Sequence, residues 1–213
     1  MQSVITKTDF SFRGLQSKYE GKVRDVYSLS NNRMIVIATD RISAFDVIMP
    51  KGIKYKGQIL NQISVEMLNK TKDIVNNWLI SSPDPNISYG IKCKPLKIEM
   101  VVRGYLSGHS YRLYRSGLRN ICGNIVKENM IENDQFKEPI VTPTTKAEIG
   151  NHDQDISPSE IISSKILDKK LYEKLHYISL ELFKRGTEIA EKSGLILVDT
   201  KYEFGLDSEN NIV

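Results

Sequence analysis

The alternation of hydrophobic and polar positions predicts a β-hairpin near the start of the chain. Residues 18–29 alternate loosely between polar and apolar side chains, and residues 34–38 form an apolar, β-branched run. Asn31 and Asn32 lie between these stretches and favour a turn. Two such stretches joined by a short turn are typical of a hairpin.

The pattern then changes along the first half of the chain. Apolar residues recur at intervals of three and four over residues 58–68, which predicts a helix. A loop is predicted at 81–86, because two prolines there interrupt either ladder. A strand is predicted at 98–102 and a short helix at 109–115.

The second half of the chain is more helical. Residues 157–160 place a capping serine, a proline at the first helical position and a glutamate at the third, so a helix begins there. A longer helix ends at Gly194. Its apolar face comprises Leu171, Leu175, Ile178, Leu182 and Ile189. A buried strand is predicted at 195–198 and a hairpin turn at 206–211.

The last residues suggest a truncated chain. Ile212 and Val213 would begin the return strand of the hairpin, and the chain stops there. Two residues cannot complete a ladder, so the preceding strand would keep unpaired backbone groups. We therefore expect further residues to follow in the complete protein.

Composition and charge favour a soluble globular protein of the cytoplasm. The 213 residues are 40% hydrophobic and 26% charged, enough for one substantial domain or two small lobes. No apolar run approaches the roughly 18 residues of a membrane helix, and the polar N-terminus lacks a signal-peptide core. The net charge of +4 suits anionic small substrates, and scattered basic residues argue against nucleic acid. Cys93 and Cys122 lack metal-ligand spacing and are expected to be reduced thiols.

The first candidate for phosphate binding is Gly21-Lys22-Val23-Arg24, within the first predicted strand. A glycine lets the backbone approach a ligand closely, and cations two residues apart point to one face of a strand. Lys22 and Arg24 could therefore clamp a polyphosphate. A solvated strand face is the alternative interpretation.

Polar residues that follow two apolar strands are candidates for substrate binding. Asp40, Ser43 and Asp46 follow the strand at 34–38, with local turn hydrogen bonds as the alternative. Arg103 follows the strand at 98–102, and arginine is the preferred bidentate partner of phosphate or carboxylate. A structural salt bridge of this arginine is the alternative.

Residues 197–205 carry the most informative pattern. Asp199, Lys201 and Glu203 alternate, so a strand would place all three side chains on one face. Two carboxylates beside a lysine suit a magnesium and phosphate site, because Mg²⁺ is held by one or two carboxylates together with phosphates and water. A cross-strand ladder of ion pairs is the alternative.

These stretches together resemble the SAICAR synthetase family. Residues 197–205 match one family signature, and residues 96–110 resemble another, with Glu99, Arg103 and Gly108 in place. Four further stretches are similar to the family: GKVRDVY, ATDRISAFDVIMP, KGQILNQIS and TPTTKAEIGNHDQDIS. The similarity runs from about residue 6 to residue 205, and several motifs in the family's order make it specific.

The resemblance implies an ATP-dependent ligase of purine biosynthesis. Members of the family join L-aspartate to the carboxylate of carboxyaminoimidazole ribonucleotide (CAIR), while ATP becomes ADP and phosphate, with Mg²⁺ as the cofactor. The implied fold is mixed α/β (α+β), with two lobes and ATP in the cleft between them. Residues 1–94 would form a β-rich nucleotide-binding lobe that resembles the small lobe of protein kinases. Residues 95–213 would form an α/β substrate-binding lobe, incomplete at its C-terminus.

The resemblance also implies roles for particular residues. The nucleotide-binding set comprises Gly21, Lys22, Val23 and Arg24, and the adenine would lie near residues 93–96. The substrate-binding set comprises Asp40, Ser43, Asp46, Arg103, Ser110 and Lys201. The catalytic set comprises Asp199, Lys201 and Glu203, with Glu203 as the magnesium ligand. Residues 146–155 would help to place L-aspartate.

Two departures from the family pattern matter. A serine normally follows the glycine directly, but here His109 lies between Gly108 and Ser110, so either His109 or Ser110 fills that role. The family also continues past Val213 with a second magnesium carboxylate and an arginine for CAIR. The alternative function is therefore a non-catalytic nucleotide-binding remnant. A kinase-like phosphotransferase is disfavoured, because the chain has no His-Arg-Asp or Asp-Phe-Gly stretch.

We expect the 213-residue chain to be inactive or nearly so, and less stable than a version with the family's C-terminal stretch. The reasons are an edge strand without its partner and an incomplete metal site. Melting temperature and CAIR-dependent ADP formation, compared between the two versions, measure both effects. Equal turnover would show that the downstream residues are dispensable.

Overall fold

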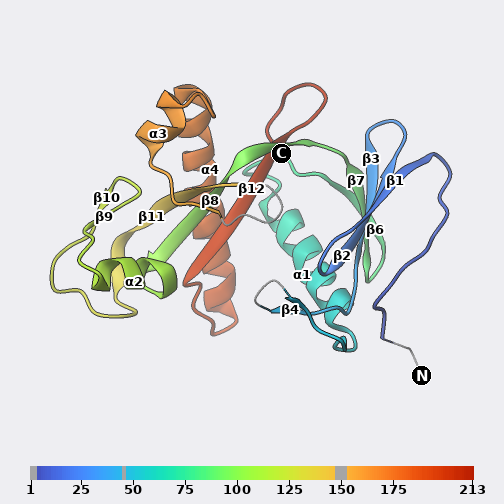
Figure 1. Ribbon diagram of the computed structural model, residues 1–213, viewed down its shortest axis with the longest axis horizontal. Helices are drawn as coiled ribbons and strands as arrows, with labels where there is room; N and C mark the ends of the chain where they lie inside the picture. The colour runs from blue at the N-terminus through green and yellow to red at the C-terminus, as the bar shows by residue number, and fades with distance from the viewer. Residues whose placement is uncertain (1–3, 45–46, 147–152) are drawn as a thin grey trace. The chain divides into compact units, whose positions relative to one another are not determined.

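The computed structural model describes residues 4–44, 47–146 and 153–213. These residues form four helices and twelve strands (Figure 1). They divide into two compact units, Met1–Lys94 together with Gly205–Val213, and Pro95–Phe204. The expected division was into residues 1–94 and 95–213, whereas Gly205–Val213 groups here with the first unit and not with the second. No helix among the described residues is long and apolar enough to cross a membrane.

The first unit is built on an antiparallel sheet, which has five strands among the described residues. In spatial order these are β1 (Leu15–Glu20), β2 (Arg24–Leu29), β3 (Arg33–Ala38), β7 (Ile87–Ile91) and β6 (Leu79–Asp84). Helix α1 (Lys56–Thr71) contacts β3, β7 and β6, which confirms the predicted helix. The short strands β4 (Ser43–Ala44) and β5 (Val47–Ile48) pair with each other.

The predicted hairpin is confirmed, but its first strand is not continuous. Asn31 and Asn32 both have positive φ, 60° and 53°, as a tight turn between β2 and β3 requires. Residues 18–29 form the end of β1 and all of β2, with a second turn at 21–23 between them. The amide of Gly21 donates to the carbonyl of Arg24 (2.8 Å), which closes this turn.

Residues 81–86 were wrongly predicted to be only a loop. Strand β6 continues to Asp84, and the turn comprises the two residues that follow it. The prolines were expected to interrupt the ladder. Pro85 lies in the turn that ends β6. Pro83 lies within β6, where the register with β7 shifts between Ser81 and Asp84. The strand continues past Pro83 because β6 is the last strand in the order of its sheet, and an edge strand tolerates a residue without an amide donor.

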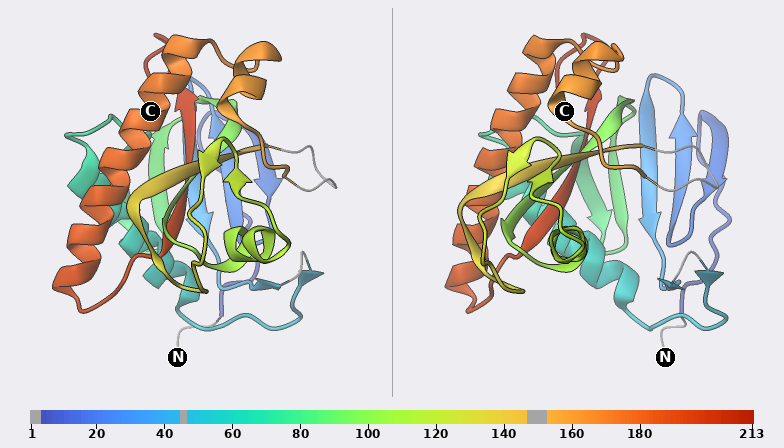
Figure 2. Two further views of the ribbon diagram at one scale, coloured as in Figure 1. Left: turned by 90° about the vertical axis from the view of Figure 1, so that its left-hand side faces the viewer. Right: turned by 60° about the vertical axis from the view of Figure 1, so that its left-hand side comes forward.

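The sheet of the second unit has the order β11 (Gln135–Thr145), β8 (Lys94–Tyr105) and β12 (Asp199–Leu206). Figure 2 shows this sheet together with α4 (Lys169–Lys192), which contacts β11 and the short helix α3 (Pro158–Ser163). Helix α2 (Gly108–Arg115) precedes a small hairpin of β9 (Asn120–Ile121) and β10 (Asn124–Ile125). A hydrophobic cluster beside them comprises Leu106, Tyr114, Ile121, Val126 and Phe136.

Helix signals in the second half were accurate. Ser157 and Glu160 form a capping box at the start of α3, with Pro158 in the first turn. Helix α4 buries Leu175, Ile178 and Leu182 of the predicted face. Gly194 has φ 69° just after the end of α4, as a left-handed terminating residue should.

The strand predicted at 195–198 is absent from the described structure. These four residues are irregular, and Leu195 and Ile196 are 63% and 70% exposed. The strand begins at Asp199 instead. The apolar residues 195–198 therefore precede β12 without being part of it. Composition alone does not say which apolar residues pair with a neighbouring strand.

The predicted hairpin turn after β12 is confirmed. The Asp207 carboxylate accepts the amides of Glu209 and Asn211, at 2.9 and 2.8 Å. Ile212 then pairs with Leu206, and Val213 and Gly205 exchange two backbone hydrogen bonds. The last two residues thus pair with the end of β12.

A buried ion pair lies inside the first unit. The carboxylate of Asp25 is 2.6 Å from the guanidinium of Arg41, and the two side chains are 0% and 6% exposed. Burial opposes ionisation of Asp25, but hydrogen bonds from Arg41 and Thr8 outweigh it and hold the pKa of Asp25 below its usual value. The ionised form is therefore the stable one in the folded protein.

Acid should weaken the first unit through Asp25. A carboxyl whose pKa is lowered by folding stabilises the protein above its unfolded pKa of 3.8, and this contribution is lost as pH falls further through the folded pKa. We expect Asp25→Asn to cost about 3–5 kcal/mol at pH 7, because Arg41 stays buried without an anion. The loss of unfolding free energy between pH 5 and 3 should be smaller in this variant than in the wild type.

Chemical denaturation at several pH values measures both effects. The matched control is Glu66→Gln, which removes the surface pair with Lys70 (3.0 Å) and should cost at most about 0.5 kcal/mol. An equal cost for the two variants would contradict the importance of the buried pair.

Candidate active site

Strand β12 presents the predicted row of charges on one face. Asp199, Lys201 and Glu203 alternate with less exposed residues, and their side chains are 47%, 45% and 51% exposed. Phe204 of the same strand is buried. The row therefore faces solvent, while the strand itself is anchored by its other side chains.

Each charge of the row has an oppositely charged partner. The Lys201 ammonium lies 2.7 Å from a carboxylate oxygen of Glu99, on the neighbouring strand β8. Arg103 of β8 is 3.1 Å from Asp199. Glu203 pairs with Lys146, which follows β11. The alternative interpretation, a ladder of ion pairs across the sheet, is thus what the structure contains.

The partners of β12 differ in burial. Glu99 and Arg103 are only 3% and 7% exposed, so their charges are largely withdrawn from water. Burial disfavours the charged form of Lys201, but the hydrogen bond and charge of Glu99 outweigh it and hold the pKa of Lys201 above its usual value. Lys201 is therefore a permanent cation at neutral pH.

Two threonines of β11 hydrogen-bond to Arg103 and Glu99, the β8 partners of the row. The sequence analysis did not identify this role. Thr142 accepts a hydrogen bond from Nε of Arg103 (2.9 Å), and Thr144 donates to Glu99 (3.3 Å). Thr144 lies opposite Glu99 in the register of the two strands. The alternation of threonines in this stretch was a usable signal, since it places both hydroxyls on one face.

The two carboxylates of the row cannot bind one metal ion together. Asp199 and Glu203 are four residues apart on a strand, which separates them by about 13 Å. No group of three His, Cys, Asp or Glu side chains in the described parts of the chain could hold a metal. The residues do fit a Mg²⁺ that takes one carboxylate from the protein and its other ligands from phosphates and water.

The predicted nucleotide-binding residues form a turn, which corrects their placement within a strand. Lys22 lies in the turn between β1 and β2, and Arg24 is the first residue of β2. They therefore do not share a strand face. Val23 and Arg24 line a cavity of about 210 Å³ in the first unit, together with Trp78 and residues of α1.

The predicted substrate residues of the first unit have different surroundings. Asp40 is buried, and its carboxylate accepts the amides of Ile5 and Gly57, both at 2.9 Å. It thereby ties the chain start to the first turn of α1. Ser43 lies in β4, and Asp46 falls outside the described residues.

His109 and Ser110 both lie in the first turn of α2, but only one reaches the surface. Ser110 is fully buried, and its hydroxyl donates to the carbonyl of Ser107 (2.8 Å). The His109 side chain is half exposed, and its Nε2 lies 2.7 Å from the carboxylate of Asp155. The histidine is the more accessible of the two.

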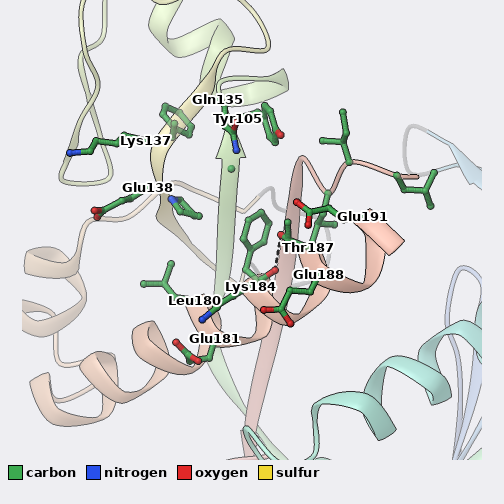
Figure 3. A pocket seen from close by; sticks show the side chains of 17 residues that line it. Tyr105, Gln135, Lys137, Glu138, Leu180, Glu181, Lys184, Thr187, Glu188 and Glu191 are labelled. Atoms are coloured by element: carbon green, nitrogen blue, oxygen red, sulfur yellow. Dashed lines mark hydrogen bonds between the residues drawn. The ribbon is translucent and has the colours of Figure 1, made fainter. Parts of the chain in front are cut away.

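A further cavity lies elsewhere in the second unit (Figure 3). It has a volume of about 730 Å³ between α4 and the strands β8 and β11, and it includes Leu195 and Ile196. Its rim carries glutamates such as Glu188 and Glu191. None of the predicted site residues lines it.

Both cysteines are poorly disposed to react. Burial, followed by the nearby charge of Asp155, raises the pKa of the Cys122 thiol to about 11. Burial and then the charge of Asp207 raise the pKa of Cys93. Neither forms a disulfide, so both are thiols that stay protonated at neutral pH.

The protein is of the mixed α/β class, and the sheet of its second unit carries a row of paired cations and carboxylates, whose cations are of the kind that suits anionic small molecules. Comparison with known families then identifies the group within this class. A profile described as SAICAR synthetase matches residues 17–213. The chain therefore belongs to the SAICAR synthetase family.

Known relatives agree with this assignment. A phosphoribosylaminoimidazole-succinocarboxamide synthase of Bacteroides thetaiotaomicron is 56% identical over 94% of this chain and 64% of its own length. The corresponding Flavobacterium psychrophilum protein is 54% identical over 99% of this chain and 67% of its own length. The chain thus spans about two thirds of the length of the relatives it matches.

Solved structures share the fold. A SAICAR synthase of Saccharomyces cerevisiae complexed with SAICAR superposes with a TM-score of 0.84 at 29% identity, covering 98% of this chain and 74% of that one. A SAICAR synthetase in complex with ADP superposes with a TM-score of 0.77 at 25% identity, covering 92% and 78%. The expected fold class is confirmed.

The pairing of Lys201 with Glu99 has a measurable consequence. In Glu99→Gln the ammonium loses its anionic partner, so the pKa of Lys201 should fall. The rate of Lys201 acylation by a small anhydride, followed by mass spectrometry, should then rise at a lower pH than in the wild type. The control Glu128→Gln removes an ion pair of Arg119 instead and should leave this profile unchanged. Identical profiles for wild type and Glu99→Gln would contradict the assignment.

Proposed function

We propose that the protein is an ATP-dependent ligase that joins L-aspartate to the carboxylate of CAIR, giving SAICAR, ADP and phosphate. The observation that carries this proposal is the family match over residues 17–213, which includes the paired cations Arg103 and Lys201. Because the chain covers 64% of its Bacteroides relative, the activity is proposed for a protein of the relatives' full length. A cytoplasmic location agrees with such a role in de novo purine biosynthesis.

The chemistry requires several anions to be gathered in one place. A carboxylate is a poor electrophile, so an oxygen of the CAIR carboxylate first attacks the γ-phosphorus of ATP, and ADP leaves. The amine of L-aspartate then attacks the acyl carbon, phosphate leaves, and the amine loses its proton. Cations that neutralise this charge lower the barrier, and alignment of the three substrates supplies much of the rest.

Arg103 and Lys201 are the proposed CAIR-binding cations. The guanidinium of Arg103 is oriented by Thr142 and Asp199, so its planar fork is held in place before a ligand arrives. Lys201 is held by Glu99 in the same way. Asp199 is half exposed and can exchange its arginine for solvent, which would leave the fork available to a substrate anion.

The turn at 21–24 is the proposed site of the ATP phosphates, with the adenine near residues 93–96. The relative solved with ADP supports a nucleotide as substrate. Glu203 is the proposed protein ligand of Mg²⁺, which would neutralise phosphate charge when bound. Since Glu203 pairs with Lys146, this lysine would have to release it.

The alternative is a non-catalytic member that binds nucleotide without turnover. The observation that favours it is that the chain spans 64% of the length of its Bacteroides relative. The two possibilities separate on product formation and not on binding.

The direct test is turnover. A protein of the relatives' full length that contains this chain, supplied with Mg²⁺-ATP, should release ADP only when both CAIR and L-aspartate are present, and SAICAR should accumulate in equal amount. Omission of either substrate is the control. ADP release with a protein hydroxyl acceptor, and none with CAIR and aspartate, would reject the ligase. Nucleotide binding without any product would favour the alternative.

Two variants should separate the substrate sites. Arg103→Lys keeps the charge but loses the planar fork, so the apparent KM for CAIR should rise while that for ATP changes little. Glu203→Gln should weaken the binding of Mg²⁺-ATP and lower turnover by orders of magnitude, because metal charge stabilisation contributes several kcal/mol. Each variant is the control of the other in steady-state kinetics. The opposite pattern would exchange the two assignments.

A further inference from the structure

Arg41 is a buried arginine to which the proposed chemistry gives no role. It lies three residues after the end of β3, and its side chain is 6% exposed. A buried guanidinium needs acceptors for its five N–H groups, because an unpaired charge withdrawn from water is costly. The acceptors of its hydrogen bonds therefore indicate which segments this arginine positions.

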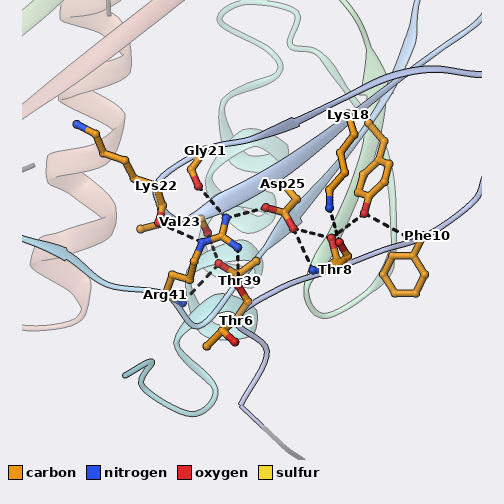
Figure 4. Close-up of polar contacts among 11 residues, drawn as sticks. Thr6, Thr8, Phe10, Lys18, Gly21, Lys22, Val23, Asp25, Thr39 and Arg41 are labelled. Atoms are coloured by element: carbon orange, nitrogen blue, oxygen red, sulfur yellow. Dashed lines mark hydrogen bonds and ion pairs between the residues drawn. The ribbon is translucent and has the colours of Figure 1, made fainter. Parts of the chain in front are cut away.

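Three of the acceptors are backbone carbonyls, and two belong to the proposed phosphate-binding turn (Figure 4). Arg41 donates from Nη2 to the carbonyl of Gly21 (2.8 Å) and from Nε to that of Lys22 (3.2 Å). It also donates from Nη1 to the carbonyl of Thr6 (2.7 Å). Asp25 balances the charge at 2.6 Å.

These contacts determine which way the amides of the turn point. A trans peptide is planar, so its N–H points opposite to its C=O. No described peptide bond is cis. Since the carbonyls of Gly21 and Lys22 both point at Arg41, the N–H groups of Lys22 and Val23 both point away from it. In Figure 4 the Lys22 side chain also extends away from the guanidinium.

Thr39, two residues before Arg41, also holds a carbonyl of the turn. Both the amide and the hydroxyl of Thr39 donate to the carbonyl of Val23, at 3.0 and 2.8 Å. The segment that follows β3 thus holds three successive carbonyls on one side of the turn. Consecutive backbone N–H groups on the opposite side of a turn make an anion-binding surface.

We propose that Arg41 is a positioning residue for the ATP phosphates, which it serves by holding the carbonyls of Gly21 and Lys22 and so directing the amides of Lys22 and Val23 toward the polyphosphate. This proposal rests on the proposed function, because it takes the turn at 21–24 as the phosphate site. A lysine in place of Arg41 can keep the charge pair with Asp25, but it lacks the planar fork that reaches several carbonyls at once.

The test is ligand binding to the purified protein by displacement of a fluorescent ATP analogue. Arg41→Lys should lower the affinity for ATP and for inorganic tripolyphosphate by about tenfold or more, since several charge-assisted hydrogen bonds to the turn are lost. Adenosine, which has no phosphate, should bind within about twofold of wild type on the same reasoning. A purely structural role would lower all three affinities together.

The control variant is Arg119→Lys. Arg119 also donates to two backbone carbonyls, those of Tyr114 (2.9 Å) and Leu118 (3.2 Å), but it lies in the second unit. The Arg119→Lys substitution should lower the melting temperature without changing the ratio of the affinity for tripolyphosphate to the affinity for adenosine. A folded Arg41→Lys protein with unchanged ATP affinity, or with equal losses for adenosine and tripolyphosphate, would overturn the proposal.

A second measurement uses the wild type and so does not depend on the variant folding. In ¹⁵N-resolved spectra, tripolyphosphate should shift the amide protons of Lys22 and Val23 downfield, as hydrogen bonding to an anion does. Binding without such shifts would overturn the role of the turn. If the wild type binds neither ATP nor tripolyphosphate, the proposed function itself fails, and that outcome is distinct from binding that ignores Arg41.

Discussion

Charges withdrawn from water must be paired, and this constraint organises both units of the protein. In the first unit, Arg41 and Asp25 are almost completely buried 2.6 Å apart. In the second, Glu99 is buried on β8 and meets Lys201 of β12 at 2.7 Å. Removing either member of such a pair leaves an uncompensated charge, so these contacts restrict which arrangements of the neighbouring segments are stable.

The same constraint explains why the site proposed to bind anions also contains carboxylates. Without substrate, the proposed ligand-binding cations need counter-charges, and the neighbouring strands supply them. The two carboxylates differ in burial, however, and so in how readily they can release their cations. Glu99 is buried and stays with Lys201, whereas Asp199 is half exposed and can release Arg103 to a ligand. Competition of this kind would tune substrate affinity without any change of fold.

Several elements could be predicted because their signals are local. The capping box of Ser157 and Glu160, the asparagine turn between β2 and β3, and the charge alternation along β12 each depend on residues within a few positions of one another. Local signals failed where a partner decides the outcome. Pro83 lies in β6 because that strand is at the edge of its sheet, and Leu195 and Ile196 are exposed because no strand pairs with them in the described structure.

The sequence by itself therefore determined the family, the order of most helices and strands, and the residue types of the site, since these depend on composition, spacing and motifs. Only the tertiary structure decided which charges meet: that Lys201 pairs with Glu99, that the Gly21–Val23 stretch is a turn, and that Arg41 holds its carbonyls. Lys201 and Glu99 are 102 residues apart in the chain. Side-chain pairing over that range is set by strand order and register, which no local pattern contains.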